Sequence, residues 1–289
     1  MSALHSQPVR DPLAELLQKI DNLAVLPHVV FKVLQISASE DAPPMELERA
    51  IIIDPAFSSK VLTLANSAFF GLPRKVTSIR EAILFLGFRS VRNLAMTVGA
   101  YDMFVGKNDK ESLRRRAWWK QSIDTAVACK WIAFYTKKTN PDDAYTSGLL
   151  HLIGKTILDR FGAGDFERVT MMTQHGIPEL IAEEKAYGCN HISVALAAAK
   201  HWGFPESLMA GLDYLRQPEE ADENTIPCCI TALGSAVAKM AHPSKSLEKS
   251  EVGEELPEWA LAQLGIQETQ KDAVIEQALG AIGAAQLHL

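Results

Sequence analysis

The sequence has no hydrophobic run long enough to cross a membrane and no cysteine pattern of a disulfide-rich or zinc-binding protein. Apolar stretches such as Ala126–Tyr135 are short and interrupted by Lys130, whereas a membrane-spanning helix needs about 20 apolar residues. Residues Met1–Arg10 lack the apolar core of a signal peptide. The cysteines show no CxxC spacing, which predicts reduced thiols at Cys129, Cys189, Cys228 and Cys229. We therefore expect a cytoplasmic protein that does not bind membranes.

An excess of positive charge is also lacking. The 289 residues include 29 Lys and Arg against 35 Asp and Glu, so the net charge is −6 at pH 7. Binding of DNA through bulk charge needs a basic surface that releases counterions, so we do not expect it here. The sequence also has no glycine-rich phosphate loop and no spacing typical of a nucleophile with its base. Hydrophobic residues, in contrast, make up 47% of the chain, which is enough for a sizeable core.

Apolar residues recur at the spacing of three and four that is typical of helices, and strand patterns are nearly absent. Asp54–Pro55 predicts a helix start, because aspartate accepts free amides and proline has no amide to lose. Ser78–Glu81 matches a capping box at the start of another helix. The polar segment Gly106–Lys110 predicts a linker. We predict an all-α protein with two packed helical lobes, residues 11–105 and 113–218, and a C-terminal helical extension, residues 219–289.

A series of short motifs lies along the first two lobes: Leu26-Pro27, Ile53–Phe57, Leu64–Gly71, Ser78-Ile79, Gly148–His151, Ile153–Lys155 and Trp202–Pro205. In this order, over about residues 20–218, they resemble the HDOD family, the regulatory relatives of HD-type phosphohydrolases. The resemblance implies that the second lobe is an HD-like helical bundle. It also implies a regulatory role in signal transduction.

The resemblance directs attention to the metal ligands of HD hydrolases, which include an adjacent His-Asp pair. Here the pair is His151-Leu152, and Gln121 stands where an earlier histidine is expected. Asp213–Arg216 replaces a later histidine pair, and Leu233–Ser235 has no carboxylate for the final aspartate. A divalent ion needs three or four ligands with a position left for water. We therefore predict no metal, no cofactor and no catalysis.

Only His151 and His191 remain as inherited ligand types. The structural alternative for His151 is a buried imidazole bonded to backbone or to a hydroxyl. For His191, which follows Asn190, the alternative is a first-turn position beside a helix cap. Gly148 and Gly154 are expected to allow close helix contact and not to bind phosphate.

Two other segments are candidate binding sites. Asn66 and Ser67 end an apolar helix, where a role in partner binding competes with local backbone capping. Arg114-Arg115-Arg116 with Trp118 begins the long helix, where positive charge is unfavourable for the helix dipole. We predict that these four residues dock an acidic signalling partner, the alternative being a solvated helix face.

The sequence therefore predicts a stand-alone regulatory protein that acts by binding a signalling protein or a small ligand. The first alternative is a residual metal-dependent phosphohydrolase of nucleotides or cyclic dinucleotides. The second is a sensor that binds a ligand, such as a nucleotide, in the space vacated by the metal.

Overall fold

The structure is a computed structural model that describes residues 11–22, 28–37, 42–67, 70–104, 109–217, 222–241 and 256–285. Within these ranges the regular elements are helices, with no strand. This confirms the predicted all-α class. None of the helices in the described ranges combines the length and the hydrophobicity needed to cross a membrane. The predicted linker Gly106–Lys110 lies mostly outside the described residues.

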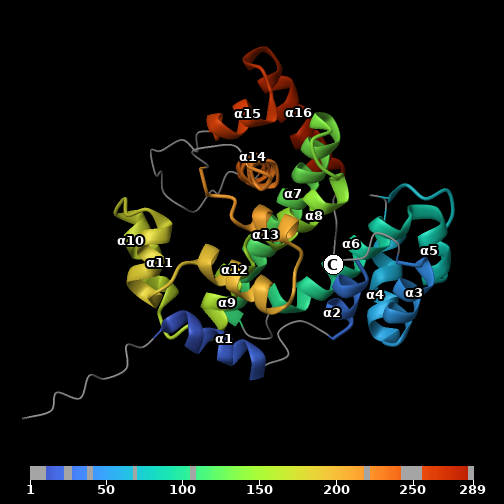
Figure 1. Ribbon diagram of the computed structural model, residues 1–289, viewed down its shortest axis with the longest axis horizontal. Coiled ribbons are helices and arrows are strands. Elements are labelled where there is room, and N and C mark those ends of the chain that lie inside the picture. Colours follow the sequence, from blue (N-terminus) through green and yellow to red (C-terminus); the bar gives the residue numbers. More distant parts are fainter. Residues whose placement is uncertain are drawn as a thin grey trace, which may run out of the picture.

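The first lobe is a group of helices on one side of the molecule (Figure 1). Its helices are α2 (His28–Ser37), α3 (Pro44–Ile52), α4 (Pro55–Ala65), α5 (Ile79–Leu86) and α6 (Phe88–Phe104). Helix α1 (Pro12–Asn22) was predicted to belong to this lobe, but it packs on α9 and α12 of the second lobe. Leu16 of α1 is buried there in the common core. Helix α1 therefore lies where its apolar face is buried.

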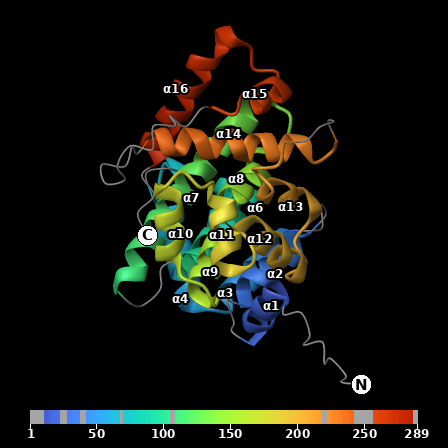
Figure 2. The ribbon, with the colours of Figure 1, turned by 90° about the vertical axis from the view of Figure 1, so that its left-hand side faces the viewer.

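The second lobe is built around the long helix α7, which packs most extensively on α8 and α14. Its members are α7 (Asp109–Thr136), α8 (Pro141–Leu150), α9 (Ile153–Phe161), α10 (Phe166–Gln174), α11 (Glu179–Tyr187), α12 (His191–His201), α13 (Glu206–Leu212) and α14 (Thr225–Ala241). Helices α15 (Glu258–Leu264) and α16 (Glu268–Ala285) lie beyond α14 at one end of the molecule (Figure 2). Helix α14 thus belongs to the bundle by its packing, whereas α15 and α16 cover its end.

The helix starts follow the capping residues of the sequence. The Asp54 carboxylate accepts the amide of Phe57 at 3.0 Å, and the Ser78 hydroxyl accepts the amide of Glu81 at 3.1 Å. The Glu81 carboxylate accepts the amide of Thr77. In a capping box it would accept the amide of Ser78, one residue later. These caps fix where α4 and α5 begin, and therefore the segment between them.

A polar contact joins the two lobes between α6 and α8. The Arg92 guanidinium donates to Asp143 at 2.8 Å, and the Asn93 amide donates to the Asp142 carbonyl at 3.1 Å. Asn93 Oδ1 in turn accepts the hydroxyl of Thr146 at 3.0 Å. Arg92, Asn93 and Thr146 are buried, so these bonds exist only when both lobes are folded and in contact.

Candidate functional site

His151 directly follows α8 and is completely buried. Its Nδ1 lies 2.7 Å from the carbonyl oxygen of Gly148, to which it donates, and this bond leaves Nε2 as the acceptor. The Ser235 hydroxyl of α14 lies 3.4 Å from Nε2. Burial lowers the pKa of His151 to about 3, so the ring is neutral at pH 7. The segment 233–235, where the final carboxylate was expected, therefore offers His151 a hydroxyl.

His191 begins α12, as its position after Asn190 predicted. The Asn190 side chain caps the helix by accepting the amide of Ser193 at 2.9 Å. The backbone amide and Nδ1 of His191 both donate to the same oxygen of Glu183, at 2.8 and 2.6 Å. His191 and Glu183 are both fully buried. These two hydrogen bonds to Glu183 fix the orientation of the imidazole and direct Nε2 into the bundle.

Tyr214 contacts both histidines. Its hydroxyl is 3.2 Å from His191 Nε2, to which it donates, and its ring centre is 5.1 Å from that of His151 at 79°. The ring centre of His191 is 6.3 Å away. Tyr214 is 6% exposed, and burial raises the pKa of its phenol far above the usual value, so the hydroxyl stays protonated.

These residues do not fit a divalent ion. Leu152 is buried in the apolar core, and Gln121 of α7 is part-exposed. The phenol of Tyr214 bonds Nε2 of His191, the nitrogen that an ion would need, and the Tyr214 ring contacts that of His151. No group of three His, Cys, Asp or Glu side chains with the spacing of a metal site occurs among the described residues. The carboxylate that directly follows the histidine in an HD pair is replaced by Leu152, and the buried Glu183 carboxylate is bonded to His191.

At the edge of this site Lys155 of α9 and Glu179 of α11 form an ion pair of 2.6 Å. Lys155 is buried, whereas the Glu179 side chain is 42% exposed. Burial alone would raise the pKa of Glu179, but the charge of Lys155 outweighs it and the pKa falls to about 2. Glu179 therefore stays ionised at neutral pH, and its contact with Lys155 connects α9 to α11.

The buried His151 makes stability depend on pH. Its pKa is about 3 in the folded state, against about 6.5 in an unfolded chain, so only the unfolded state takes up the proton between these values. The contribution is complete above pH 6.5, and we expect the free energy of unfolding to fall by about 1.4 kcal/mol for each pH unit below that. Urea unfolding of wild type and His151→Asn from pH 7 to 5 measures the difference. Equal slopes in the two proteins would contradict a neutral buried His151.

The arginine cluster lies at the contact of α7 with α9 and α10. Arg114 pairs with Asp159, and Arg115 Nε lies 3.5 Å from the same carboxylate. The Arg114 guanidinium also lies 4.7 Å from the ring centre of Phe166. Trp118, which was expected near the surface, is buried against Phe166 with ring centres 4.9 Å apart.

These contacts assign most of the cluster to folding. Arg115 and Trp118 are buried, and Arg114 is part-buried by its contacts with Asp159 and Phe166. Only Arg116 is exposed and available to a partner. Docking on this cluster therefore remains a prediction that depends on Arg116 alone. The basic run has a structural reason that its sequence did not show, because Asp159 lies 45 residues beyond Arg114.

Asn66 ends α4 and holds the segment that follows it. Its amide donates to the carbonyls of Leu62 and Val76, both at 2.9 Å, and its Oδ1 accepts the amide of Val76 at 2.8 Å. This confirms the backbone-capping alternative for Asn66. The Ser67 hydroxyl is buried without a hydrogen-bond partner among the described residues. Asn66 thus holds residues 75–78 in position after the end of α4.

Comparison with known proteins places this geometry in a family. A protein called "Putative phosphohydrolase" from Shewanella amazonensis has 24% identity and a TM-score of 0.69, over 95% of this chain and 98% of that one. An HDOD domain protein with unknown function from Geobacter sulfurreducens has 24% identity and a TM-score of 0.70, over 96% and 98%. At this identity the two structures show a shared fold.

An uncharacterized protein of Treponema pallidum is 25% identical over 271 residues, which are 92% of this chain and 50% of that protein. The chain therefore spans about half the length of this relative. Residues 23–218 of the sequence match the protein family described as "HDOD domain". The match covers more than half of the chain, and the protein belongs to the HDOD family.

Proposed function

We propose that this HDOD protein is a regulatory component of signal transduction that acts by binding a partner protein and not by hydrolysis. The observation that carries the proposal is that Tyr214 fills space beside both His151 and His191, with its hydroxyl bonded to His191. An HD hydrolase needs this space for a metal ion and its water. A structure from Marinobacter aquaeolei with the same fold, 20% identical and with a TM-score of 0.68, is called a "Putative signal transduction protein", which supports a regulatory role.

The two alternatives are less well supported. A residual phosphohydrolase is favoured by the name of the Shewanella relative, but the ligand set of Leu152, Gln121 and Tyr214 opposes it. A sensor with a ligand in the vacated metal site would need an open space between the histidines. Tyr214 contacts both rings, so a ligand shared by the two histidines would have to displace a buried and hydrogen-bonded side chain.

The proposal predicts a protein without metal-dependent activity. After purification in the presence of Zn²⁺, Mn²⁺ and Mg²⁺, we expect no stoichiometric transition metal by elemental analysis. We also expect no hydrolysis of bis(p-nitrophenyl) phosphate, nucleoside triphosphates or cyclic dinucleotides above buffer. A chelator should leave the melting temperature unchanged, because no folding energy derives from a metal.

The control for this assay is the His151→Asn variant, which removes a remaining imidazole. Wild type and variant should both match the background rate. A bound metal at one equivalent, together with turnover that His151→Asn abolishes, would show that the site is active in an altered form and would overturn the proposal.

A further inference from the structure

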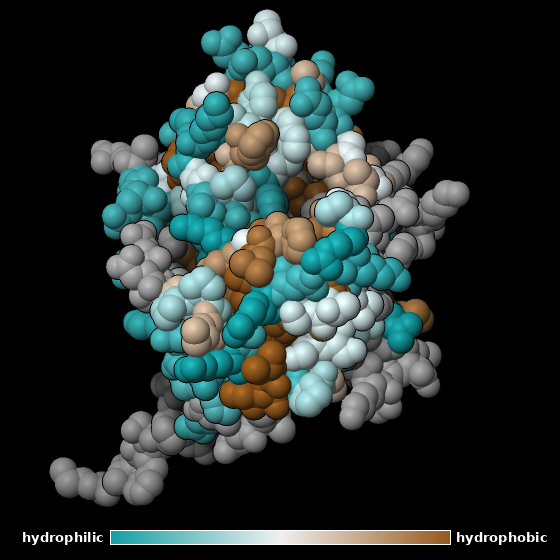
Figure 3. Space-filling model, turned by 90° about the vertical axis from the view of Figure 1, so that its right-hand side faces the viewer, coloured by the Kyte–Doolittle hydropathy of each residue, from teal (hydrophilic) through white to brown (hydrophobic). Residues whose placement is uncertain are grey.

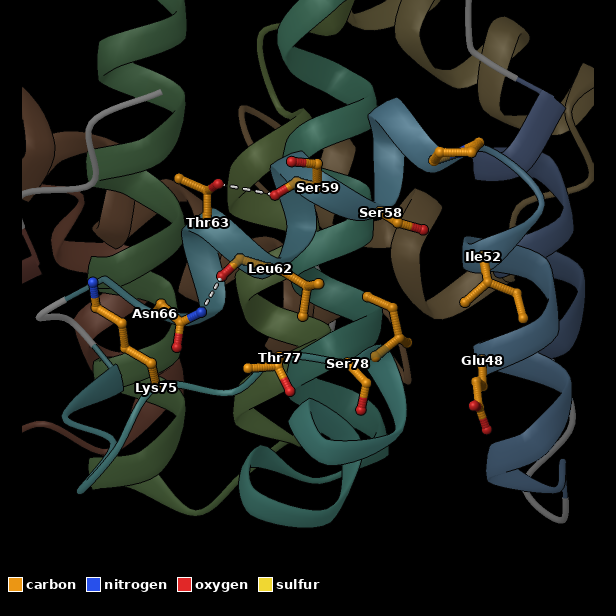
Figure 4. A pocket seen from close by; sticks show the side chains of 12 residues that line it. Glu48, Ile52, Ser58, Ser59, Leu62, Thr63, Asn66, Lys75, Thr77 and Ser78 are labelled. Carbon is orange, nitrogen blue, oxygen red and sulfur yellow. Dashed lines mark hydrogen bonds between the residues drawn. The ribbon is translucent and has the colours of Figure 1, made fainter.

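The first lobe carries an open groove of about 770 Å³ between α3, α4 and the segment of residues 75–78. Figure 4 shows Asn66 and Lys75 on one side of it and Glu48 and Ile52 on the other. Its volume lies within the usual range of about 300–1,000 Å³ for ligand sites. The groove is distant in sequence from His151, and none of His151, His191 and Tyr214 lines it.

The groove combines an apolar floor with polar edges. Ile52 is 50% exposed and Leu62 is part-exposed, whereas Ile79, which also lines the groove, is buried. Figure 3 views the molecule from the side of α5 and shows hydrophobic side chains in its lower half, bordered by hydrophilic ones. Exposed aliphatic side chains with a polar border are typical of a binding surface.

The edge formed by residues 75–78 is held in place from both sides. The amide and the carbonyl of Val76 are both bonded to the Asn66 side chain, and the amide of Thr77 is bonded to Glu81. The backbone that carries Lys75 and Thr77 is therefore fixed before any ligand arrives. A preformed edge lowers the entropy cost of binding.

The charge of this region is opposite to that of the whole chain. Residues 44–92, which include all of α3, contain seven Lys and Arg and four Asp and Glu, a net charge of +3, whereas the chain carries −6, so the remaining residues carry −9. Lys75 lines the groove, is exposed, and takes part in no ion pair within the described part of the chain. Positive potential beside an aliphatic floor selects for a ligand that has both acidic and apolar side chains.

We propose that the groove between α3, α4 and residues 75–78 binds an acidic segment of a partner protein, with an aliphatic side chain on Ile52 and carboxylates beside Lys75. This inference rests on the proposed function, because it names the surface and the kind of partner through which the protein acts. It also gives Asn66 the role of a positioning residue for the edge.

A protein segment fits the groove better than a nucleic acid. No aromatic side chain lines it, and single-stranded nucleic acid is held largely by stacking on such side chains. Two nearby arginines are already paired, Arg74 with Glu81 and Arg80 with Glu48. What remains is one free lysine on an aliphatic surface, which suits a carboxylate next to a leucine or isoleucine.

The test is selection of a phage-displayed library of random peptides on the full-length protein. The peptides recovered are then measured by fluorescence polarisation against wild type and against the Ile52→Ser/Lys75→Glu variant. We expect acidic peptides with one or two aliphatic residues, whose affinity for the variant falls by about tenfold or more. Raising NaCl from about 0.05 M to about 0.5 M should also weaken binding, because exposed charges are screened.

The matched control is Ile181→Ser/Lys185→Glu on α11, since Ile181 is 44% exposed and Lys185 is exposed, as in the groove. This variant should bind the peptides like wild type. Recovery of no peptides, of peptides without acidic enrichment, or of peptides that bind both variants equally overturns the inference. Binding of a single-stranded DNA oligonucleotide that only the groove variant loses would assign the groove to nucleic acid instead. The hydrolysis assay tests the proposed function separately, so the two can fail independently.

Discussion

The Gly154→Ala variant is expected to lose about 3 kcal/mol or more of its free energy of unfolding, at or above the upper end of the usual cost of overpacking. A Cβ atom at residue 154 would lie 1.9 Å from the carbonyl oxygen of His191 and 3.1 Å from the amide nitrogen of Ala195. Both are backbone atoms of α12, which no side-chain rotation can move away. Helices α9 and α12 would have to separate, and with them the contact that holds His191.

The control is the same substitution at Gly283 of α16, where a Cβ would meet nothing within 4 Å. Glycine loses more backbone conformational entropy than alanine when it folds into a helix, which favours alanine by about 0.5–1 kcal/mol. Stability should therefore rise at this position. Urea unfolding monitored by circular dichroism measures both variants. Opposite signs would confirm close approach of α9 and α12. A change below about 1 kcal/mol at Gly154 would show that the two helices can move apart at little cost.

Removal of the Glu183 side chain is the second change with a large expected effect. Its buried carboxylate accepts both the amide and the ring nitrogen of His191. In Glu183→Ala these two donors remain buried without an acceptor, and we expect a loss of about 3–5 kcal/mol. Glu183→Gln keeps one acceptor oxygen and should lose less.

The neighbouring Glu184 provides the comparison, because it is exposed and bonds the Asn190 side chain. Glu184→Ala should cost less than about 1 kcal/mol, as is usual for exposed contacts. Thermal unfolding of the three variants at pH 7 gives the ranking. If Glu183→Ala and Glu184→Ala are equally stable, the bond to His191 does not support the fold.

The features that could be predicted from the sequence are those determined by contacts within a few residues. Asp54, Ser78 and Asn190 cap helices because an Asp, Ser or Asn side chain reaches an amide two or three residues further on. The residue at position 152 was also readable in the sequence, and a leucine there cannot bind an ion. Each of these conclusions depends on one residue and its immediate neighbours.

What the sequence did not show depends on distant contacts. Tyr214 lies 23 residues after His191, and Glu183 lies eight residues before it, with no spacing rule to join them. The role of Glu183 could have been noticed only if its burial were known. Trp118 and Arg115 were misjudged for a related reason. Helix α7 packs against α6, α8, α9, α14 and α16, so it has few exposed positions from which a surface could be predicted.

The contact of α6 with α8 limits how this protein can be divided or combined with others. If the lobes were separated, the polar groups of Arg92 and Asn93 would lose Asp143, the Asp142 carbonyl and Thr146 as partners. Each lobe alone would also expose the apolar surface around those groups. The smallest portable module is therefore the pair of lobes, and a fusion partner can be attached only outside it without dividing a cooperative unit.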